Sequence, residues 1–427
     1  MSYPDPEARK PKSAARRMPF RAPRPSSFVI RQCTRLLPRI MRKGYGIESV
    51  GYQDAELRRL QELIKEHRVL ITPNHPTHAE PVVLFHLSRQ IETDFYYLSN
   101  RESFDRYWGL FGWLLTRTGA YSILRGVPDR ESFKFTRKVL AERIAPLVIF
   151  PEGEVYSQND SLLPFQAGVF QLALLALDDM VKAGRDQPLY VQPTAIRYRF
   201  VEDMGQAIIE SIQRLERQLG LPNPPPGDSY LRLRRIGDAV LTAAEKAYRL
   251  PRGDAEDLNP RIDAVRNRIV ERVAESMDLE MESLGKTLPD QMRALINRVN
   301  RVVTDEEAPS SEYQERLLRE ESERIRPLHQ DLKRLSNWVA VRDGYVAELA
   351  TQERMVDTLW RLESEVLGRR ILEGRRECWV RLSEPIDLRE YAQTPRKSAI
   401  QSATERVERD IQTLLTEMAV HDADPPT

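Results

Sequence analysis

Short apolar runs alternate with longer amphipathic segments between residues 67 and 200, and this alternation restricts the possible folds more than any other feature of the chain. The segments 129–144 and 167–177 have the apolar spacing of helices. Strand-like apolar runs occupy residues 68–72, 94–99, 120–125, 146–151 and 188–196. Strands that alternate with helices form a mainly parallel sheet with helices on its faces. The sequence therefore predicts an α/β fold.

The pattern changes twice after residue 200. Residues 201–375 are highly charged and read almost entirely as helix, whereas 377–388 returns to strand character and 397–418 reads as a closing helix. We therefore predict a large all-helical insertion before the last strand of the α/β core, which provides a scaffold or a surface for a protein partner or for self-association. The expected parts are a basic N-terminal segment 1–44, the first part of the core 45–200, the insertion 201–375 and the end of the core 376–427.

Charge is balanced over the whole chain but not along it. Lys and Arg total 65 against 64 Asp and Glu, so the net charge of +1 gives no indication of a nucleic-acid partner. Residues 1–44 contain twelve basic side chains and only two acids, Asp5 and Glu7. Such a block is a solvated tail or binds an anionic surface. Within it, 28–44 reads as a basic helix that either lies in a membrane interface or packs on the core with its arginines in water.

Cysteine usage and hydropathy indicate the compartment. With only Cys33 and Cys378, the sequence favours a reducing environment without a disulfide framework. No secretory signal is apparent, and the longest central apolar run, 107–116, is far shorter than the ~18 residues expected of a membrane span. We predict a cytoplasmic protein, peripheral on the cytoplasmic face of the membrane. The aromatic side chains of that run are more often core than interface or acyl-chain contacts: Tyr107, Trp108, Phe111 and Trp113.

The stretch "NHPTHAEP", residues 74–81, directly follows the predicted strand 68–72. The ends of parallel strands are where active residues gather in α/β folds. A metal site formed by His75, His78 and Glu80 is one interpretation, but no further His or Cys stands at a strand end to complete it, and we expect no metal or cofactor. A second interpretation is a polar turn without catalytic function, which is more common for such a stretch than a catalytic site. The third is a catalytic base, His75, oriented by the carboxylate of Glu80.

Five segments in order resemble the motifs of one enzyme family. These segments are "NHPTHAE", "GAYSILRG" (119–126), "IFPEGEVYS" (149–157), "VQPTAIRY" (191–198) and "VRLSEPIDL" (380–388). They resemble the motifs of the glycerophospholipid acyltransferases, the 1-acylglycerol-3-phosphate O-acyltransferase family. The resemblance covers about 68–200 and 377–420 and includes neither the basic N-terminal segment nor the helical insertion.

The resemblance implies transfer of a fatty acyl group from acyl-CoA or acyl carrier protein to a hydroxyl of a lysophospholipid-like acceptor. It implies that His75 is the base, with Glu80 at the position of the family's aspartate. It also implies that Arg125 holds the acceptor's phosphate, and that Glu152 and Gly153, with Asn74, complete the substrate-binding set. His78 matches no fixed position of the motif.

Two departures from the family pattern affect these expectations. Glu80 is one methylene longer than aspartate, so its contact with His75 needs different spacing. Glu154 and Val155 replace the usual threonine and arginine, which removes a cation and adds an anion where phosphate is expected. Two alternatives therefore remain: a catalytically inactive lipid-binding or adaptor protein on the same scaffold, or an acyltransferase with a non-phosphate acceptor.

Overall fold

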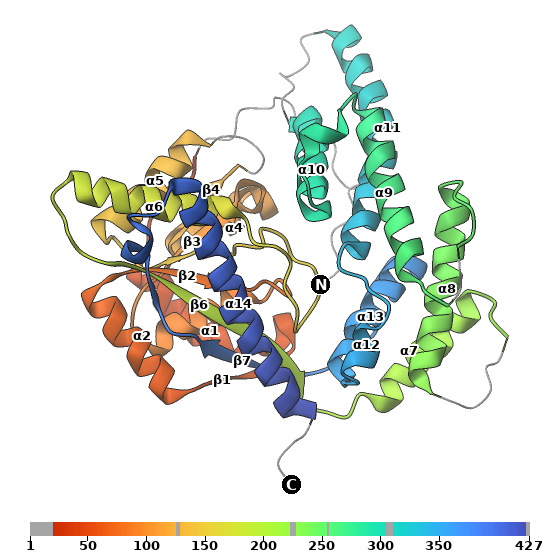
Figure 1. The fold of residues 1–427 in the computed structure, drawn as a ribbon, viewed down its shortest axis with the longest axis horizontal. Coiled ribbons are helices and arrows are strands. Elements are labelled where there is room, and N and C mark those ends of the chain that lie inside the picture. The colour runs from red at the N-terminus through yellow and green to blue at the C-terminus, as the bar shows by residue number, and fades with distance from the viewer. Residues whose placement is uncertain (1–19, 125–128, 223–227, 254–255, 305–310, 424–427) are drawn as a thin grey trace. The chain divides into compact units, whose positions relative to one another are not determined.

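The structure is a computed structural model that describes residues 20–124, 129–222, 228–253, 256–304 and 311–423 (Figure 1). The chain forms two compact units. One contains Phe20–Glu202 and Arg375–Thr427, and the other contains Asp203–Gly374. The second unit nearly coincides with the insertion predicted at 201–375.

Within the described residues, the first unit is built on one eight-stranded sheet with the order β1-β7-β6-β2-β5-β3-β4, and β8 pairs with β6. Neighbouring strands are parallel except where β6 meets β7 and β8. The predicted α/β fold with a mainly parallel sheet is therefore confirmed, including the return of the chain to the sheet after the helical insertion. The strands are β1 Ile47–Tyr52, β2 Arg68–Pro73, β3 Tyr96–Asn100, β4 Ala120–Ile123, β5 Leu147–Val148, β6 Leu189–Phe200, β7 Arg376–Leu382 and β8 Ile386–Asp387.

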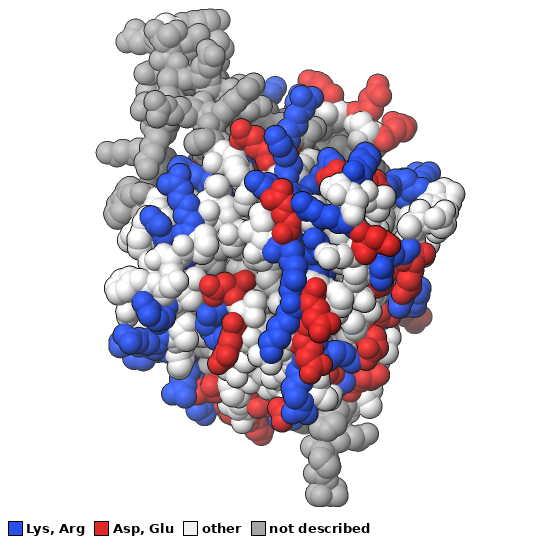
Figure 2. Space-filling view, turned by 90° about the vertical axis from the view of Figure 1, so that its left-hand side faces the viewer, with Lys and Arg blue, Asp and Glu red and all other residues white. Residues whose placement is uncertain are grey.

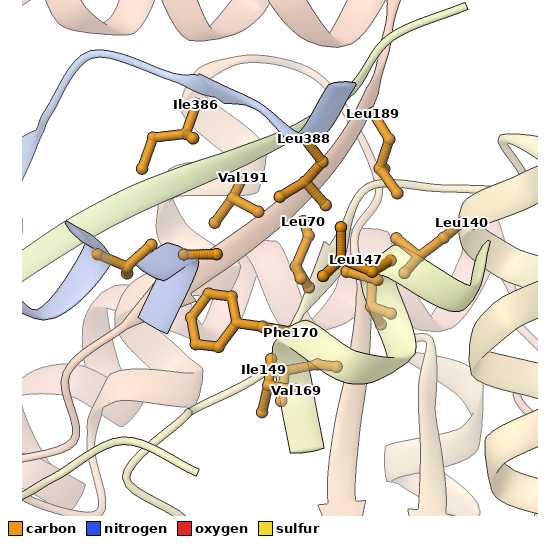
Figure 3. Packing of buried hydrophobic residues seen from close by; sticks show 14 of the residues in the cluster. Leu70, Leu140, Leu147, Ile149, Val169, Phe170, Leu189, Val191, Ile386 and Leu388 are labelled. Carbon is orange, nitrogen blue, oxygen red and sulfur yellow. The ribbon is translucent and has the colours of Figure 1, made fainter. Parts of the chain in front are cut away.

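Helices cover both faces of this sheet. One face packs against α5 Arg130–Glu142, α6 Ala167–Lys182 and α14 Arg396–Ala423. In this cluster, Phe170 of α6 packs among Leu147 and Val191 of the sheet (Figure 3). The other face packs against α1 Ser27–Tyr45, α2 Asp54–Glu66 and α3 Glu80–Gln90. The result is a three-layer α/β/α unit whose sheet is buried on both sides.

Several element boundaries differ from the sequence-based expectations. The run 146–151 contains a strand of only two residues, because the chain leaves the sheet after Val148 and turns through Gly153, whose φ is 75°. The predicted strand 377–388 is two strands, β7 and β8. The run 107–116 is divided at Gly109 between a 3-10 segment, Arg101–Gly109, and α4 Leu110–Arg117.

The core interpretation of that aromatic run is wrong for Trp113, whose side chain is 49% exposed. The side chains of Tyr107 and Trp108 lie outside what the structure describes, and Phe111 is half-buried. None of the helices in the described residues is long and apolar enough to cross a bilayer.

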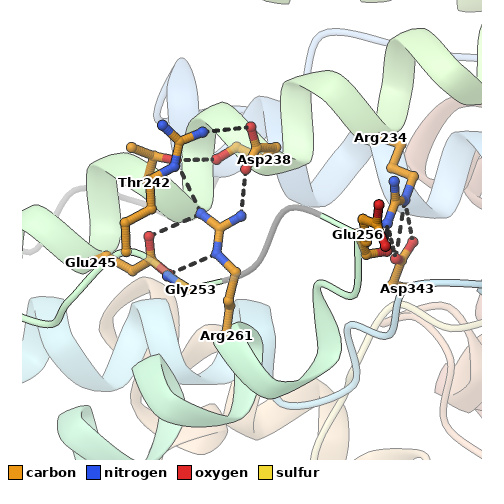
Figure 4. Close-up of polar contacts among 9 residues, drawn as sticks. Arg234, Asp238, Thr242, Glu245, Gly253, Glu256, Arg261 and Asp343 are labelled. Atoms are coloured by element: carbon orange, nitrogen blue, oxygen red, sulfur yellow. Dashed lines mark hydrogen bonds and ion pairs between the residues drawn. The ribbon is translucent and has the colours of Figure 1, made fainter.

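The second unit is helical and contains buried ion pairs. Arg261 of α9 is 3% exposed and donates to both carboxylate oxygens of Glu245 on α8, at 2.7 and 2.9 Å (Figure 4). It also pairs with Asp238. Bidentate pairing of this kind fixes the register of two neighbouring helices. The helices are α7 Gly205–Gln218, α8 Ser229–Ala247, α9 Asn259–Ser276, α10 Leu288–Thr304, α11 Glu312–Trp338, α12 Tyr345–Glu348 and α13 Gln352–Val366, with a 3-10 turn at Met281–Leu284.

Candidate active site

Two loops meet at the carboxyl edge of the sheet. β2 and β5 are parallel neighbours, with Ile71 opposite Val148, so the segments that follow both strands leave the sheet on the same side. The loop after β2 contains Asn74 and His75 and leads into α3, which starts at Glu80. The loop after β5 contains Glu152 and Gly153. The predicted clustering of these two motifs at strand ends is what the structure shows.

His75 and Glu80 are in direct contact. The Nδ1 atom of His75 lies 2.6 Å from Oε2 of Glu80, whose side chain is fully buried. An ionised carboxylate only accepts hydrogen bonds, so Nδ1 carries the hydrogen and Nε2 is left as the basic nitrogen. The ring of His75 also stacks on Phe150, with centroids 4.2 Å apart. The imidazole is therefore fixed in orientation and in tautomer.

Thr77 bends the intervening loop back onto Glu80. Its backbone N–H donates to the Glu80 carboxylate at 3.1 Å and its hydroxyl donates at 2.6 Å. The same hydroxyl accepts from the N–H of Ala79. Pro81 in the first turn of α3 suits a helix start, because proline lacks the N–H that would be unpaired there. These contacts accommodate the extra methylene of glutamate while keeping its carboxylate against His75.

Tyr198 on β6 supplies the remaining contact of the carboxylate. Its hydroxyl donates to Oε1 of Glu80 at 2.6 Å, and the tyrosine is 2% exposed. Burial alone would raise the pKa of Glu80, but hydrogen bonds from His75, Thr77 and Tyr198 lower it below the ordinary value. Glu80 is therefore ionised at neutral pH and able to stabilise an imidazolium on His75.

Two asparagines hold this part of β6 in place where β2 has already ended. Asn74 accepts from the N–H of Ile196 at 2.7 Å and donates to the carbonyl of the same residue at 2.9 Å. Asn159 makes the same pair of contacts with Tyr198, at 2.8 and 2.5 Å. Each side-chain amide thus replaces a missing strand partner. The contacts of Asn74 indicate a structural role, and substrate binding by this residue stays a prediction.

Glu152 holds the loop that contains His75 through a hydrogen bond to its backbone. One carboxylate oxygen accepts the backbone N–H of His75 at 2.6 Å and the other accepts the N–H of Leu163 at 3.1 Å. Burial raises the pKa of Glu152 to about 7, although these two hydrogen bonds lower it in part. Gly153 beside it has positive φ, and a Cβ there would lie 1.6 Å from the side chain of Gln166. The positive φ is the feature that favours glycine here, since the amide is the flexible end of the Gln166 side chain and can shift aside.

Arg125, predicted to hold a phosphate, lies outside the described residues. His78 is exposed, with its ring edge-on to His75 at 6.4 Å. Among the described residues, no group of three or more His, Cys, Asp or Glu is arranged to hold a metal ion.

Sequence reasoning missed three side chains of the site: Thr77, Asn159 and Tyr198. Tyr198 is the last letter of "VQPTAIRY", so the motif marked its position but not its role.

Together the fold and the site define an α/β protein with a histidine–carboxylate dyad at the end of a central strand, an arrangement suited to proton abstraction from a hydroxyl. Residues 54–197 match the family model described as Acyltransferase. The match supports assignment of this segment to the acyltransferase family and acyl transfer as its general activity. It contains His75, Glu80 and Glu152 and ends one residue before Tyr198. No curated protein matches the chain.

Proposed function

We propose that the protein is an acyltransferase that moves a fatty acyl group from an acyl thioester to a hydroxyl of a lysophospholipid-like acceptor. The observation that carries this proposal is the 2.6 Å contact between His75 and a buried, ionised Glu80 within the segment that matches the family. A polar turn has no need of a carboxylate held by three donor residues. This geometry favours catalysis over the alternative of an inactive adaptor.

In the proposed reaction, Nε2 of His75 takes the proton of the acceptor hydroxyl as its oxygen attacks the thioester carbonyl. Glu80 stabilises the imidazolium that forms, because it accepts the hydrogen of Nδ1. The tetrahedral intermediate then expels the thiolate, which takes the proton from His75. The products are an ester and a free thiol, and the imidazole is neutral again. No metal or redox cofactor takes part in these steps.

The acceptor class is the less constrained half of the proposal. Glu154 and Val155 stand where the resembled motif has threonine and arginine, so this loop offers no guanidinium to a phosphate. A lysophospholipid with a singly charged headgroup fits this composition better than a doubly charged phosphomonoester. The alternative is an acceptor without phosphate. A panel of substrates with and without a phosphate group distinguishes the two.

The direct experiment incubates the purified protein with acyl-CoA, or with acyl carrier protein loaded with the same chain, and a panel of lysolipids. The readouts are free thiol and acylated product. His75→Ala should lower the rate by about 100-fold or more, and Glu80→Gln should also lower it because the charge that supports the imidazolium is lost.

His86 provides a matched control on the same helix as Glu80. It accepts or donates a 2.8 Å hydrogen bond with the hydroxyl of Tyr52, away from the dyad, and His86→Ala should keep the activity. Full activity of His75→Ala would contradict the proposed mechanism.

A further inference from the structure

Helix α1 exposes apolar side chains on the side that faces away from the core. Its inner side chains Ile30, Leu37 and Met41 are buried, with exposures of 4–5%. Its outer side carries Phe28, Leu36 and Ile40, which are 64%, 54% and 39% exposed. A helix that only covers a sheet normally has a polar outer face. The outer face of α1 is therefore more apolar than its packing requires.

Helix α4, which is joined to the start of α1, also exposes apolar side chains. Leu110 and Trp113 on α4 are 68% and 49% exposed. The segment that enters α1 is hydrogen-bonded to the end of α4: the N–H of Arg24 donates to the carbonyl of Thr116 at 2.8 Å, and the N–H of Ser26 donates to that of Arg117 at 3.0 Å. We call the exposed side chains of these two joined helices the α1–α4 surface.

Basic side chains are interleaved with the apolar ones. Helix α1 contains no Asp or Glu, and its outer basic residues are all exposed: Arg31, Arg35, Arg39, Arg42 and Lys43. Arg117 lies over the ring of Trp113, at 5.9 Å. Arg42 has an acidic neighbour, Glu48, at 3.5 Å. In Figure 2, which turns the left-hand side of Figure 1 towards the viewer, basic and acidic residues lie side by side.

We propose that the α1–α4 surface docks the protein on a bilayer that contains anionic phospholipids. Apolar side chains enter the boundary between headgroups and acyl chains, and the arginines pair with the phosphates. A second copy of the chain is the less favourable occupant, because self-association would bring two cationic surfaces together. If the proposed function is correct, this bilayer is where the acyl transfer takes place. The docking proposal itself depends only on the α1–α4 surface and not on the reaction.

Vesicle binding by the full chain tests this inference. Phosphatidylcholine vesicles with and without phosphatidylglycerol are the probes, and binding should be strong only when phosphatidylglycerol is present. Leu36→Glu and Leu110→Glu should each weaken binding by about tenfold or more, since each removes an inserted apolar group and adds repulsion. Val181→Glu on α6, at a residue that is 65% exposed, is the matched control and should bind as the wild type does.

Site-resolved and oligomeric readouts complete the test. Brominated lipid should quench tryptophan fluorescence in the wild type and much less in Trp113→Leu.

Equal binding to both vesicle types, or equal binding by Leu36→Glu and Val181→Glu, would overturn the proposal. So would sedimentation that shows a dimer abolished by Leu36→Glu. Turnover of a soluble short-chain acceptor is measured in parallel, so that absent thiol release with intact vesicle binding counts against the proposed function alone.

Discussion

At the scale of single residues, the carboxylate of Glu80 links His75 on the loop after β2 to Tyr198 on β6. Both partners lie 2.6 Å from it, one on each oxygen. Asn159 fixes the backbone of Tyr198, so the loop that follows the Glu152 motif also determines where the Glu80 carboxylate sits. Tyr198 is therefore a positioning residue, buried too deeply to reach a substrate.

The variant Tyr198→Phe tests this role. Loss of a hydrogen bond to a charged group, about 1.5–3 kcal/mol, should lower kcat by roughly tenfold to a hundredfold with little change in KM. Steady-state kinetics with a soluble acceptor, on protein whose folding is checked by circular dichroism, measure this change.

Tyr121→Phe is the control for Tyr198→Phe. Its hydroxyl is hydrogen-bonded to Thr136 at 2.8 Å in the cluster on the opposite face of the sheet. This variant should lose stability without a fall in kcat. An unchanged kcat in Tyr198→Phe as well would assign Tyr198 a purely structural role.

Glu152 makes the stability of the fold dependent on pH. Its pKa is raised to about 7 by burial, above the ordinary value of 4.5 that it regains on unfolding. Between these values the folded state binds more protons than the unfolded state, so the free energy of unfolding falls as pH rises. Glu152→Gln removes this titration, and its stability relative to the wild type should increase from pH 4.5 to 7 by up to about 3 kcal/mol.

Urea unfolding at several pH values measures this difference. Glu66→Gln, at a side chain that is 77% exposed, should leave the pH dependence unchanged. A constant difference between Glu152→Gln and the wild type across this range would show that the carboxyl does not titrate there.

At the scale of helices and strands, the pair of α8 and α9 depends on the buried contact between Arg261 and Glu245. Arg261→Ala leaves Glu245 buried without its cation, which costs about 3–5 kcal/mol. Hydrogen exchange in peptides from 229–276 should accelerate accordingly. Arg268 on the same helix pairs with Glu271 and Glu275 on the surface, and Arg268→Ala should change little. Unchanged exchange in Arg261→Ala would show that packing alone holds the two helices.

Local sequence patterns predicted many of the helices and strands and part of the candidate site. Alternation of apolar runs gave the sheet, and the five-residue spacing from His75 to Glu80 gave their contact. Tyr198 and Asn159 could not be assigned roles, because their contacts depend on how far β6 extends beyond β2. Trp113 was assigned to the core by its residue type, whereas its exposure depends on the turn at Gly109. Strand β1 and helix α2 were not predicted, since their apolar residues, such as Ile47 and Leu60, find their partners only in the assembled sheet.

At the scale of the whole molecule, the helical unit leaves and re-enters the sheet at one place. Phe200 at the end of β6 lies opposite Arg376 at the start of β7, and the N–H of Val201 donates to the carbonyl of Arg375 at 3.1 Å. The two strands are thus an antiparallel hairpin whose connection is Asp203–Gly374. Long connections in a hairpin are tolerated, because the entropy of loop closure rises slowly with length.

A chain in which a short Gly/Ser linker replaces Asp203–Gly374 should therefore keep the sheet. We expect cooperative thermal unfolding by circular dichroism and retained thiol release with a soluble acceptor. A chain that ends at Glu202 is the comparison, and it should not fold, because β6 loses β7 and β8 and β1 loses its partner. An unfolded linker variant would show that the helical unit is needed for the core.

The position of β7 also has a consequence for synthesis on the ribosome. Strand β7 lies between β1 and β6 in the sheet. It is translated after the helical unit, so β1 and β6 have no strand between them until then. At 5–20 residues per second, that delay is about 10–30 seconds. Throughout it the edge of β6 is open, and an open edge is a template for aggregation. We expect the nascent chain to be a client of chaperones that shield exposed strands until β7 emerges.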